Sequence, residues 1–159
     1  MNSPLHDPLE ALRAVQAFAM FTLDGSRWLL PQTEVQALET LLDIDLEMRV
    51  SQSVGAITVA SEWWSVYCLS GELHLLSQIP AGRRVCLLLN NGADCFGLAC
   101  DHIEALVGTT LPLHPVPMCM VTPDSPIQAL ALFDQGLGCV TTTEHIARRI
   151  AMAGDRADV

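Results

Sequence analysis

Residues Val85–Ile103, V-C-L-L-L-N-N-G-A-D-C-F-G-L-A-C-D-H-I, consist of two apolar runs separated by Asn90-Asn91-Gly92. An Asn-Gly pair between two β-forming runs indicates a hairpin, because type I′ turns require a positive φ that Asn and Gly tolerate. Asp24-Gly25 separates the runs Phe18–Leu23 and Arg27–Leu30 in the same way. The stretch therefore predicts a chain that is built largely from antiparallel hairpins.

The remainder of the chain continues this pattern of short strands and turns. Further strands are expected at Val54–Val59, Trp63–Leu69 and Leu73–Leu76, and a third hairpin at Ile127–Phe133 and Leu137–Thr143. The Pro-rich segment Leu111–Pro117 favours polyproline or edge-strand geometry. Many short strands, with a turn about every eight to twelve residues, predict a mainly β barrel or sandwich.

Helical spacing is confined to three places. Apolar residues at positions 5, 9, 12 and 15 predict a short helix within Leu5–Val15, and Glu144–Met152 predicts a closing helix. The spacing within Val35–Leu42 also fits a helix better than a strand. We therefore expect an N-terminal extension over residues 1–17, one domain over 18–152 and a flexible tail over 153–159.

Composition excludes several classes of partner. The net charge is −10 and all eight cationic side chains are arginines, so the chain repels phosphate backbones and nucleic acid is not expected as a partner. Its apolar runs are broken within about eight residues, which is too short for membrane insertion. Met1–Glu10 lacks the basic region of a secretory signal, and six cysteines without a C-x-x-C pair then predict reduced thiols in the cytoplasm.

Acidic residues concentrate between positions 34 and 47. A solvated face explains such a cluster most simply, and a docking surface for a basic partner is the alternative. The acids are Glu34, Glu39, Asp43, Asp45 and Glu47.

Cys100-Asp101-His102 invites a catalytic interpretation. If a strand runs through all three residues, Cys100 and His102 share a face and Asp101 points away, so Asp101 cannot orient that histidine. A nucleophilic cysteine also needs an environment that lowers its pKa, whereas the neighbours of Cys100 are apolar. We expect Cys100 in the core and Asp101 in a hydrogen-bonded strand end or turn.

Other chemical sites have equally weak signals. His102, His114 and Cys119 lack the closely paired spacing of zinc ligands, and the chain has no Gly-rich phosphate loop and no G-x-S-x-G motif. We therefore expect no catalytic residue, cofactor or metal, and by elimination a binding module. A thiol or metal site on Cys100 and His102 is retained as an alternative, as is a structural homo-oligomeric scaffold.

Trp63-Trp64 is the most conspicuous candidate for a contact site. Adjacent strand residues face opposite sides, so at most one of the two side chains readily fills a given core face. The other is either covered by another part of the chain or exposed, and exposed tryptophan is enriched at binding hot spots.

Two longer motifs extend this interpretation. Gly55–Leu69 aligns without gaps with the pattern G-V-I-N-L-R-G-x-x-x-P-V-I-D-L, and Gly97–Ile103 fits G-L-x-V-D-x-V. Phe21–Pro31 fits an opening hairpin with a D-G turn, and Ile127–Val140 fits a closing hairpin. On these residues the chain resembles the CheW-like family, the coupling proteins of bacterial chemosensory systems.

The resemblance implies two small five-stranded SH3-like β-barrels in one domain, with short terminal helices. It also implies a strand at Leu29–Val35, after which the helical spacing would be an insertion. The function implied is a non-enzymatic cytoplasmic adaptor that binds a histidine kinase regulatory domain, a chemoreceptor tip or both.

Departures from the family pattern fall in the central motif. The family's N-L-R-G is Thr58-Val59-Ala60-Ser61 here, and Ala60 supplies neither the charge nor the five donors of the family arginine, which supports receptor coupling. The resemblance thus implies a divergent member, of the kind found in type IV pilus (twitching) clusters. Partner contacts are expected at Thr58, Ala60, Ser61, Glu62, Trp63 and Trp64.

Overall fold

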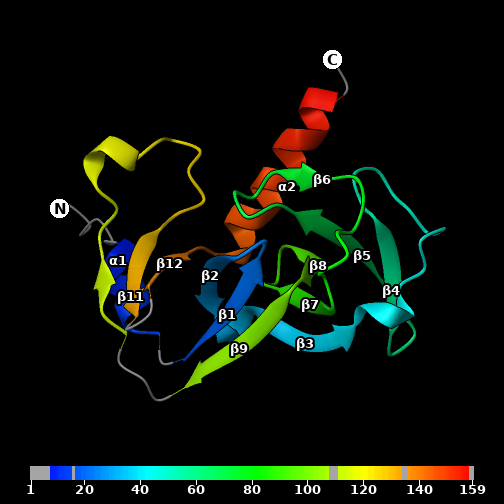
Figure 1. The fold of residues 1–159 in the computed structure, drawn as a ribbon, viewed down its shortest axis with the longest axis horizontal. Coiled ribbons are helices and arrows are strands. Elements are labelled where there is room, and N and C mark those ends of the chain that lie inside the picture. Colours follow the sequence, from blue (N-terminus) through cyan, green and yellow to red (C-terminus); the bar gives the residue numbers. More distant parts are fainter. Residues whose placement is uncertain (1–7, 16, 108–110, 134–135, 158–159) are drawn as a thin grey trace.

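The computed structural model describes residues 8–15, 17–107, 111–133 and 136–157. These form two β-sheets and two α-helices, so the expectation of a mainly β fold with two small barrel-like halves is confirmed (Figure 1). Each sheet has six strands. Five per sheet remain when the two-residue strands β6 and β10 are left out, as the resemblance implies.

The first sheet joins the two ends of the chain. Its strand order is β10-β11-β12-β2-β1-β9. The strands are β1 (Ala17–Leu23), β2 (Ser26–Pro31), β9 (His102–Val107), β10 (Leu113–His114), β11 (Ala129–Phe133) and β12 (Gly136–Val140).

The second sheet is formed by the middle of the chain. Its order is β3-β7-β8-β5-β4, and β6 pairs with β5. The strands are β3 (Val35–Thr40), β4 (Gly55–Val59), β5 (Glu62–Leu69), β6 (Leu75–Leu76), β7 (Val85–Asn90) and β8 (Cys95–Cys100). Because β9 follows β8 in sequence but pairs with β1, the chain crosses between the sheets at Asp101.

Side-chain alternation places three apolar cores in this small molecule. Leu87 and Leu89 of β7 point into the core between the two sheets, whereas Cys86 and Leu88 point into the core of the second half. A third core lies within the first half around Phe18. Burial of β7 on both faces explains why V-C-L-L-L shows no polar alternation.

The first two predicted hairpins form, but with different turns. Asp24 and Gly25 have φ values of 50° and 88°, as the type I′ turn requires. Between β7 and β8 the loop has four residues, 91–94, and within it a positive φ of 93° occurs at Gly92 alone. The Asn91 side chain accepts hydrogen bonds from the amides of Ala93 and Asp94, so the two-residue turn predicted there is wrong.

The C-terminal part of the first sheet follows the predictions. β11 and β12 pair antiparallel, which confirms the third hairpin, although its expected turn residues Asp134 and Gln135 lie outside the described residues. Within the Pro-rich segment, β10 is an edge strand that pairs with β11.

The helix predicted for Val35–Leu42 is wrong. Residues 35–40 form β3, which pairs antiparallel with β7 and has a bulge between Val35 and Ala37; the short 3-10 helix η2 (Leu41–Asp43) follows. Of the residues that suggested a helical face, Leu38 is 52% exposed and Leu42 is 93% exposed. Pairing with an already formed strand outweighs the local apolar spacing. The strand implied at Leu29–Val35 is also interrupted, since β2 ends at Pro31 and Gln32–Glu34 is the 3-10 helix η1.

Both predicted terminal helices are present. Helix α1 (Pro8–Arg13) packs Leu12 into the core of the first half. Helix α2 (Thr143–Ala157) places Ile146 and Ile150 in the core between the sheets. Helix α2 continues beyond residue 152 to Ala157, so residues 153–157 are helical where a flexible tail was predicted.

His145 lies in the first turn of α2 and is held in its neutral form. Its Nδ1 is 2.6 Å from Thr142 Oγ1, and its Nε2 is 3.0 Å from the Gln128 side-chain nitrogen. An amide nitrogen only donates, so Nε2 accepts and Nδ1 carries the hydrogen. Burial, with help from nearby Arg148, lowers the pKa of His145, although Glu144 and Glu34 act in the opposite direction.

This lowered pKa predicts a loss of stability in mild acid. The unfolded chain gains a proton as the pH falls through its ordinary value of 6.5, whereas the folded chain gains it only at lower pH. The free energy of unfolding should therefore fall between about pH 7 and pH 5, and His145→Gln should flatten this fall. Urea unfolding at several pH values measures it. His74→Gln, at a histidine whose side chain is 69% exposed, is the control for the loss of an imidazole.

Candidate functional site

The predicted contact residues occupy the β4–β5 hairpin. Thr58 pairs with Trp63 and Val59 with Glu62 around a turn at Ala60-Ser61. The two tryptophans face opposite sides, as strand alternation predicts: Trp63 is 56% exposed and Trp64 is 4% exposed. Trp64 packs in the core of the second half. A partner contact was expected there, but the side chain is not part of the exposed surface. The remaining exposed residues are called the Trp63 surface: Thr58, Ala60, Ser61, Glu62 and Trp63.

The turn of this hairpin is strained. Ala60 and Ser61 have φ values of 50° and 67°, in the left-handed region where residues with a Cβ are disfavoured by roughly 1–2 kcal/mol. Type I′ turns favour Asn-Gly at these two positions. The chain therefore keeps a costly turn at the tip of the candidate surface, a pattern seen at functional sites.

Ser61→Gly is expected to stabilise the protein by about 1 kcal/mol, because glycine adopts positive φ without a steric penalty. Thermal or urea unfolding measures the change. Ser61→Ala keeps the strain and should give no gain. Equal stability of the glycine and alanine variants would show that the turn stores no such strain.

One end of the hairpin is covered and the other is open. β4 is an edge strand, and Asp45 forms a short bridge with Ala56 through backbone hydrogen bonds of 2.8 and 3.0 Å. A Cβ on Gly55 would lie 2.7 Å from the Asp45 carbonyl oxygen, so glycine permits this close approach. Beyond the bridge, the structure gives Ile57–Val59 no strand partner except β5 among the described residues. The open edge leads directly to the Trp63 surface.

The outer face of β5 continues from Trp63 toward helix α2. Trp63, Ser65 and Tyr67 alternate onto one face of the strand. The Tyr67 ring meets Phe96 edge to face, with centroids 5.9 Å apart and an interplanar angle of 84°. These two rings and Ile150 of α2 line a pocket of about 410 Å³. An aromatic anchor followed by an apolar groove suits a protein contact better than a reaction.

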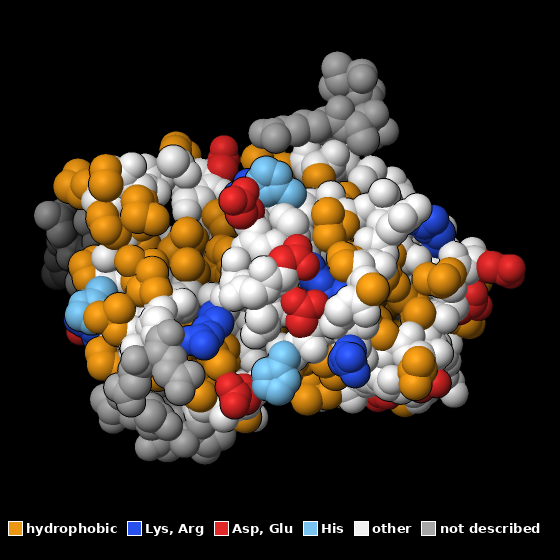
Figure 2. Space-filling view, viewed as in Figure 1, with side chains coloured by type: hydrophobic (Ala, Val, Ile, Leu, Met, Phe, Trp, Pro, Cys, Tyr) orange, Lys and Arg blue, Asp and Glu red, His pale blue; other side chains and the backbone are white. Residues whose placement is uncertain are grey.

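A second exposed apolar region, which no sequence motif predicted, lies on the first half. It surrounds the 3-10 helix η3 (Met118–Met120), where Met118 is 92% exposed. Figure 2 shows hydrophobic side chains gathered over this part of the molecule, at the upper left. We call this the η3 surface: Met118, Met120, Val121 and Leu132.

The main polar feature of the interior, Arg83, was also missed. This buried arginine donates from Nη1 to the Ala99 carbonyl (2.9 Å) and from Nη2 to the Leu69 carbonyl (2.7 Å). Its Nη2 also donates to Asp24 Oδ1 at 2.9 Å. Nε lies 3.0 Å from Asp101 Oδ1, an ion pair without hydrogen-bond geometry. Nothing in the local sequence distinguishes Arg83 from its exposed neighbour Arg84.

This network joins the two sheets. Asp24 lies in the β1–β2 turn of the first sheet, whereas Leu69 and Ala99 belong to the second. Asp101 sits at the crossover and accepts a hydrogen bond of 2.7 Å from the Asp24 amide. Asp101, the aspartate of the G-L-x-V-D-x-V motif, therefore has a structural role. This agrees with its expected place in a hydrogen-bonded strand end or turn.

The Cys100–His102 alternative is not supported by the structure. β8 ends at Cys100 and β9 begins at His102, so no single strand alternates through the three residues as assumed. Cys100 is fully buried and His102 is exposed. Burial raises the pKa of the Cys100 thiol well above its ordinary value. A thiol with these properties is a core residue and not a nucleophile.

The other thiols near Cys100 are no more reactive. Burial raises the pKa of Cys68 to about 11 and that of Cys86 to about 12, so both stay protonated at neutral pH. Within the described parts of the chain, no three His, Cys, Asp or Glu side chains are grouped as metal ligands.

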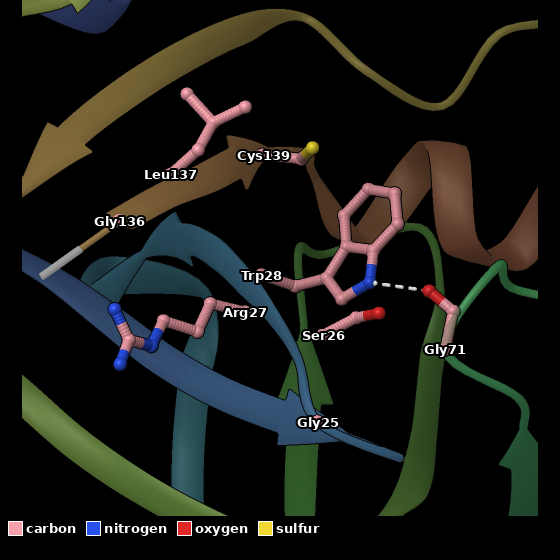
Figure 3. Close-up of a pocket in the computed structure, with 8 residues that line it drawn as sticks. All are labelled: Gly25, Ser26, Arg27, Trp28, Gly71, Gly136, Leu137 and Cys139. Atoms are coloured by element: carbon pink, nitrogen blue, oxygen red, sulfur yellow. Dashed lines mark hydrogen bonds between the residues drawn. The ribbon is translucent and has the colours of Figure 1, made fainter.

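A polar pocket lies where the two halves meet. Figure 3 shows it between β2, β12 and the loop at Gly71, where Trp28 Nε1 donates a 3.0 Å hydrogen bond to the Gly71 carbonyl. Ser26 and Cys139 line it, and burial raises the pKa of the Cys139 thiol. No histidine or carboxylate is among the described lining residues, so neither group has an adjacent general base.

Comparisons with known proteins identify the fold through a solved structure. No protein-family model and no curated protein matches the chain. A solved structure, the scaffolding protein TtCheW from Thermoanaerobacter tengcongensis, superposes with a TM-score of 0.62. The match covers 92% of this chain and 93% of that one, at 14% sequence identity. The chain has a CheW-like fold.

This result confirms the fold that the motifs at Gly55 and Gly97 implied. Both glycines lie where this chain brings neighbouring strands close together. Among the described residues, no helix is long and apolar enough to cross a membrane.

Proposed function

We propose that this CheW-like protein is a non-enzymatic adaptor of a bacterial chemosensory array, acting in the cytoplasm. The observation that carries the proposal is the CheW-like fold over 92% of the chain, with a half-exposed tryptophan on its edge hairpin. The buried, protonated thiols and the lack of a nucleophile–base pair among the described pocket residues support a non-enzymatic role.

The first partner we propose is the regulatory domain of a histidine kinase, bound at the Trp63 surface. An adaptor needs a second contact site, and the η3 surface on the other half offers apolar side chains for it. A chemoreceptor tip is the second partner in this scheme. Because Ala60 replaces the family arginine, we place the protein in a divergent array such as a type IV pilus cluster.

Trp63→Ala is expected to weaken binding to the regulatory domain of the organism's chemosensory kinase by at least about 1 kcal/mol, because exposed aromatic anchors dominate interface energies. Isothermal titration calorimetry with purified proteins measures this. Leu38→Ala removes a similarly exposed apolar side chain (52%) on the opposite edge strand β3 and should bind like the parent protein.

Two outcomes oppose the proposal. If the parent protein does not bind the regulatory domain at high micromolar concentration, the kinase is not its partner. If Trp63→Ala and Leu38→Ala weaken binding equally, the effect is not specific to the Trp63 surface. Light scattering on the parent protein tests the homo-oligomeric alternative in the same samples.

A further inference from the structure

Two pockets along β6 and helix α2 share lining residues. One, of about 510 Å³, includes Arg49, Ser77 and Leu76; the other, of about 260 Å³, includes Arg149 and His74. Leu75 and Ala153 line both, so the pockets meet there. We call the combined feature the β6–α2 groove.

The groove is basic in a strongly acidic protein. The net charge of the chain is −10, yet the ionisable side chains among the described lining residues are Arg49, Arg149 and His74. His74 lies 4.0 Å from Glu72, so the positive charge of the groove comes from the two arginines. None of the described lining residues is acidic. A positive groove on a negative molecule therefore selects for an anionic ligand.

Both arginines lack an acidic partner among the described residues, unlike two other arginines of the chain. Arg83 is paired with two aspartates, and Arg148 is 2.7 Å from Glu144. Arg49 instead donates to the backbone carbonyls of Ser53 (3.4 Å) and Ser77 (2.8 Å).

Arg149 has an unmet hydrogen-bonding requirement. Its Nε is buried without a hydrogen-bond partner in the structure as described. A buried donor left unpaired destabilises the folded protein, and more so when it is charged. A carboxylate in the groove would meet the part of the Arg149 guanidinium group that lines the pocket, and guanidinium groups bind carboxylates through paired hydrogen bonds.

We propose that the β6–α2 groove binds an acidic, partly apolar segment of a partner protein. Its carboxylates pair with Arg49 and Arg149, and an apolar side chain between them lies on Leu75 and Ala153, which both pockets share. The groove is formed by other residues than the Trp63 surface, so this site goes beyond the kinase contact proposed above and does not depend on it.

The test uses the full chain and a fluorescein-labelled peptide of four Glu-Leu repeats in fluorescence anisotropy titrations. Peptides of four Gln-Leu and four Lys-Leu repeats are the probe controls. We expect the Glu-Leu peptide alone to bind, and its affinity to fall as salt is added. Arg149→Gln and Arg49→Gln should each weaken it by about tenfold, the loss expected for a charge-assisted hydrogen bond.

Arg148→Gln is the matched control for Arg149→Gln. It changes the net charge equally and lies next to Arg149 on the same helix, but its side chain is exposed and paired with Glu144. It should leave the affinity within about twofold of the parent value, well below the expected tenfold loss. Trp63→Ala should also bind the peptide normally. If Arg49→Gln fails to fold, as judged by its thermal melt, Arg149→Gln alone decides.

Several results overturn the proposal: no binding of the Glu-Leu peptide at millimolar concentration, equal binding of the Lys-Leu peptide, or equal losses in Arg148→Gln and Arg149→Gln. Self-association that Arg149→Gln abolishes also overturns it, because a second copy of the chain would then fill the groove. If only the kinase titration fails, the proposed binding site in the β6–α2 groove is unaffected.

Discussion

Arg83→Leu should lower the free energy of unfolding by about 3 kcal/mol, near the lower end of the range for breaking a buried ion pair. The guanidinium side chain is 0% exposed, and its removal leaves the carbonyls of Leu69 and Ala99 buried without their donor. The side chains of Asp24 and Asp101 are 44% and 24% exposed, so water screens them in part and the loss stays moderate. Urea unfolding followed by tryptophan fluorescence measures this value.

Arg84→Leu is the matched control for this experiment. It removes the same charge one residue later, from an exposed side chain, and should change stability by less than about 0.5 kcal/mol. Because Arg83 joins the two sheets, its loss should also reduce their cooperativity, and the two halves should then unfold in separable steps. Equal small effects of both variants would show that the network contributes nothing to stability.

Several of the predictions that proved correct concern local structure. Asp24-Gly25 and the β7–β8 hairpin are set by residues adjacent in sequence, and turn chemistry identifies them without knowledge of the fold. The alternation of Trp63 and Trp64 is equally local, so the sequence correctly predicted that the two side chains face opposite sides, although it did not indicate which of them is exposed.

The predictions that failed depend on contacts distant in sequence. β3 has the apolar spacing of a helix and becomes a strand because β7, some fifty residues later, offers it a hydrogen-bonding edge. The error at Cys100 and His102 arose because the chain crosses to the other sheet at Asp101, which strand periodicity does not reveal. Arg83 is one arginine of a pair, and only the approach of Asp24 and Asp101 distinguishes it from Arg84.

Gly97→Ala should destabilise the protein by about 1–3 kcal/mol, the usual cost of overfilling a packed core. A Cβ at residue 97 would lie 2.8 Å from Cys86 Sγ and 3.2 Å from Val66 Cγ2. Both neighbours are fully buried, in strands that flank β8, so neither has free space to move into. Gly82→Ala is the control, because its Cβ would meet only an aspartate oxygen at the ordinary distance of 3.6 Å.

A double-mutant cycle identifies the cause of the Gly97 effect. Cys86→Ala removes the sulfur that the new methyl group would strike, so the double variant Cys86→Ala/Gly97→Ala should be more stable than the sum of the single effects predicts, by about 1 kcal/mol. Strict additivity would mean that the two residues do not share space in the folded protein. The close packing of β7 on β8 would then not be the cause of the Gly97→Ala effect. Since a Cβ at residue 97 would lie only 2.8 Å from Cys86 Sγ across the β7–β8 pair, we expect the coupling to be present.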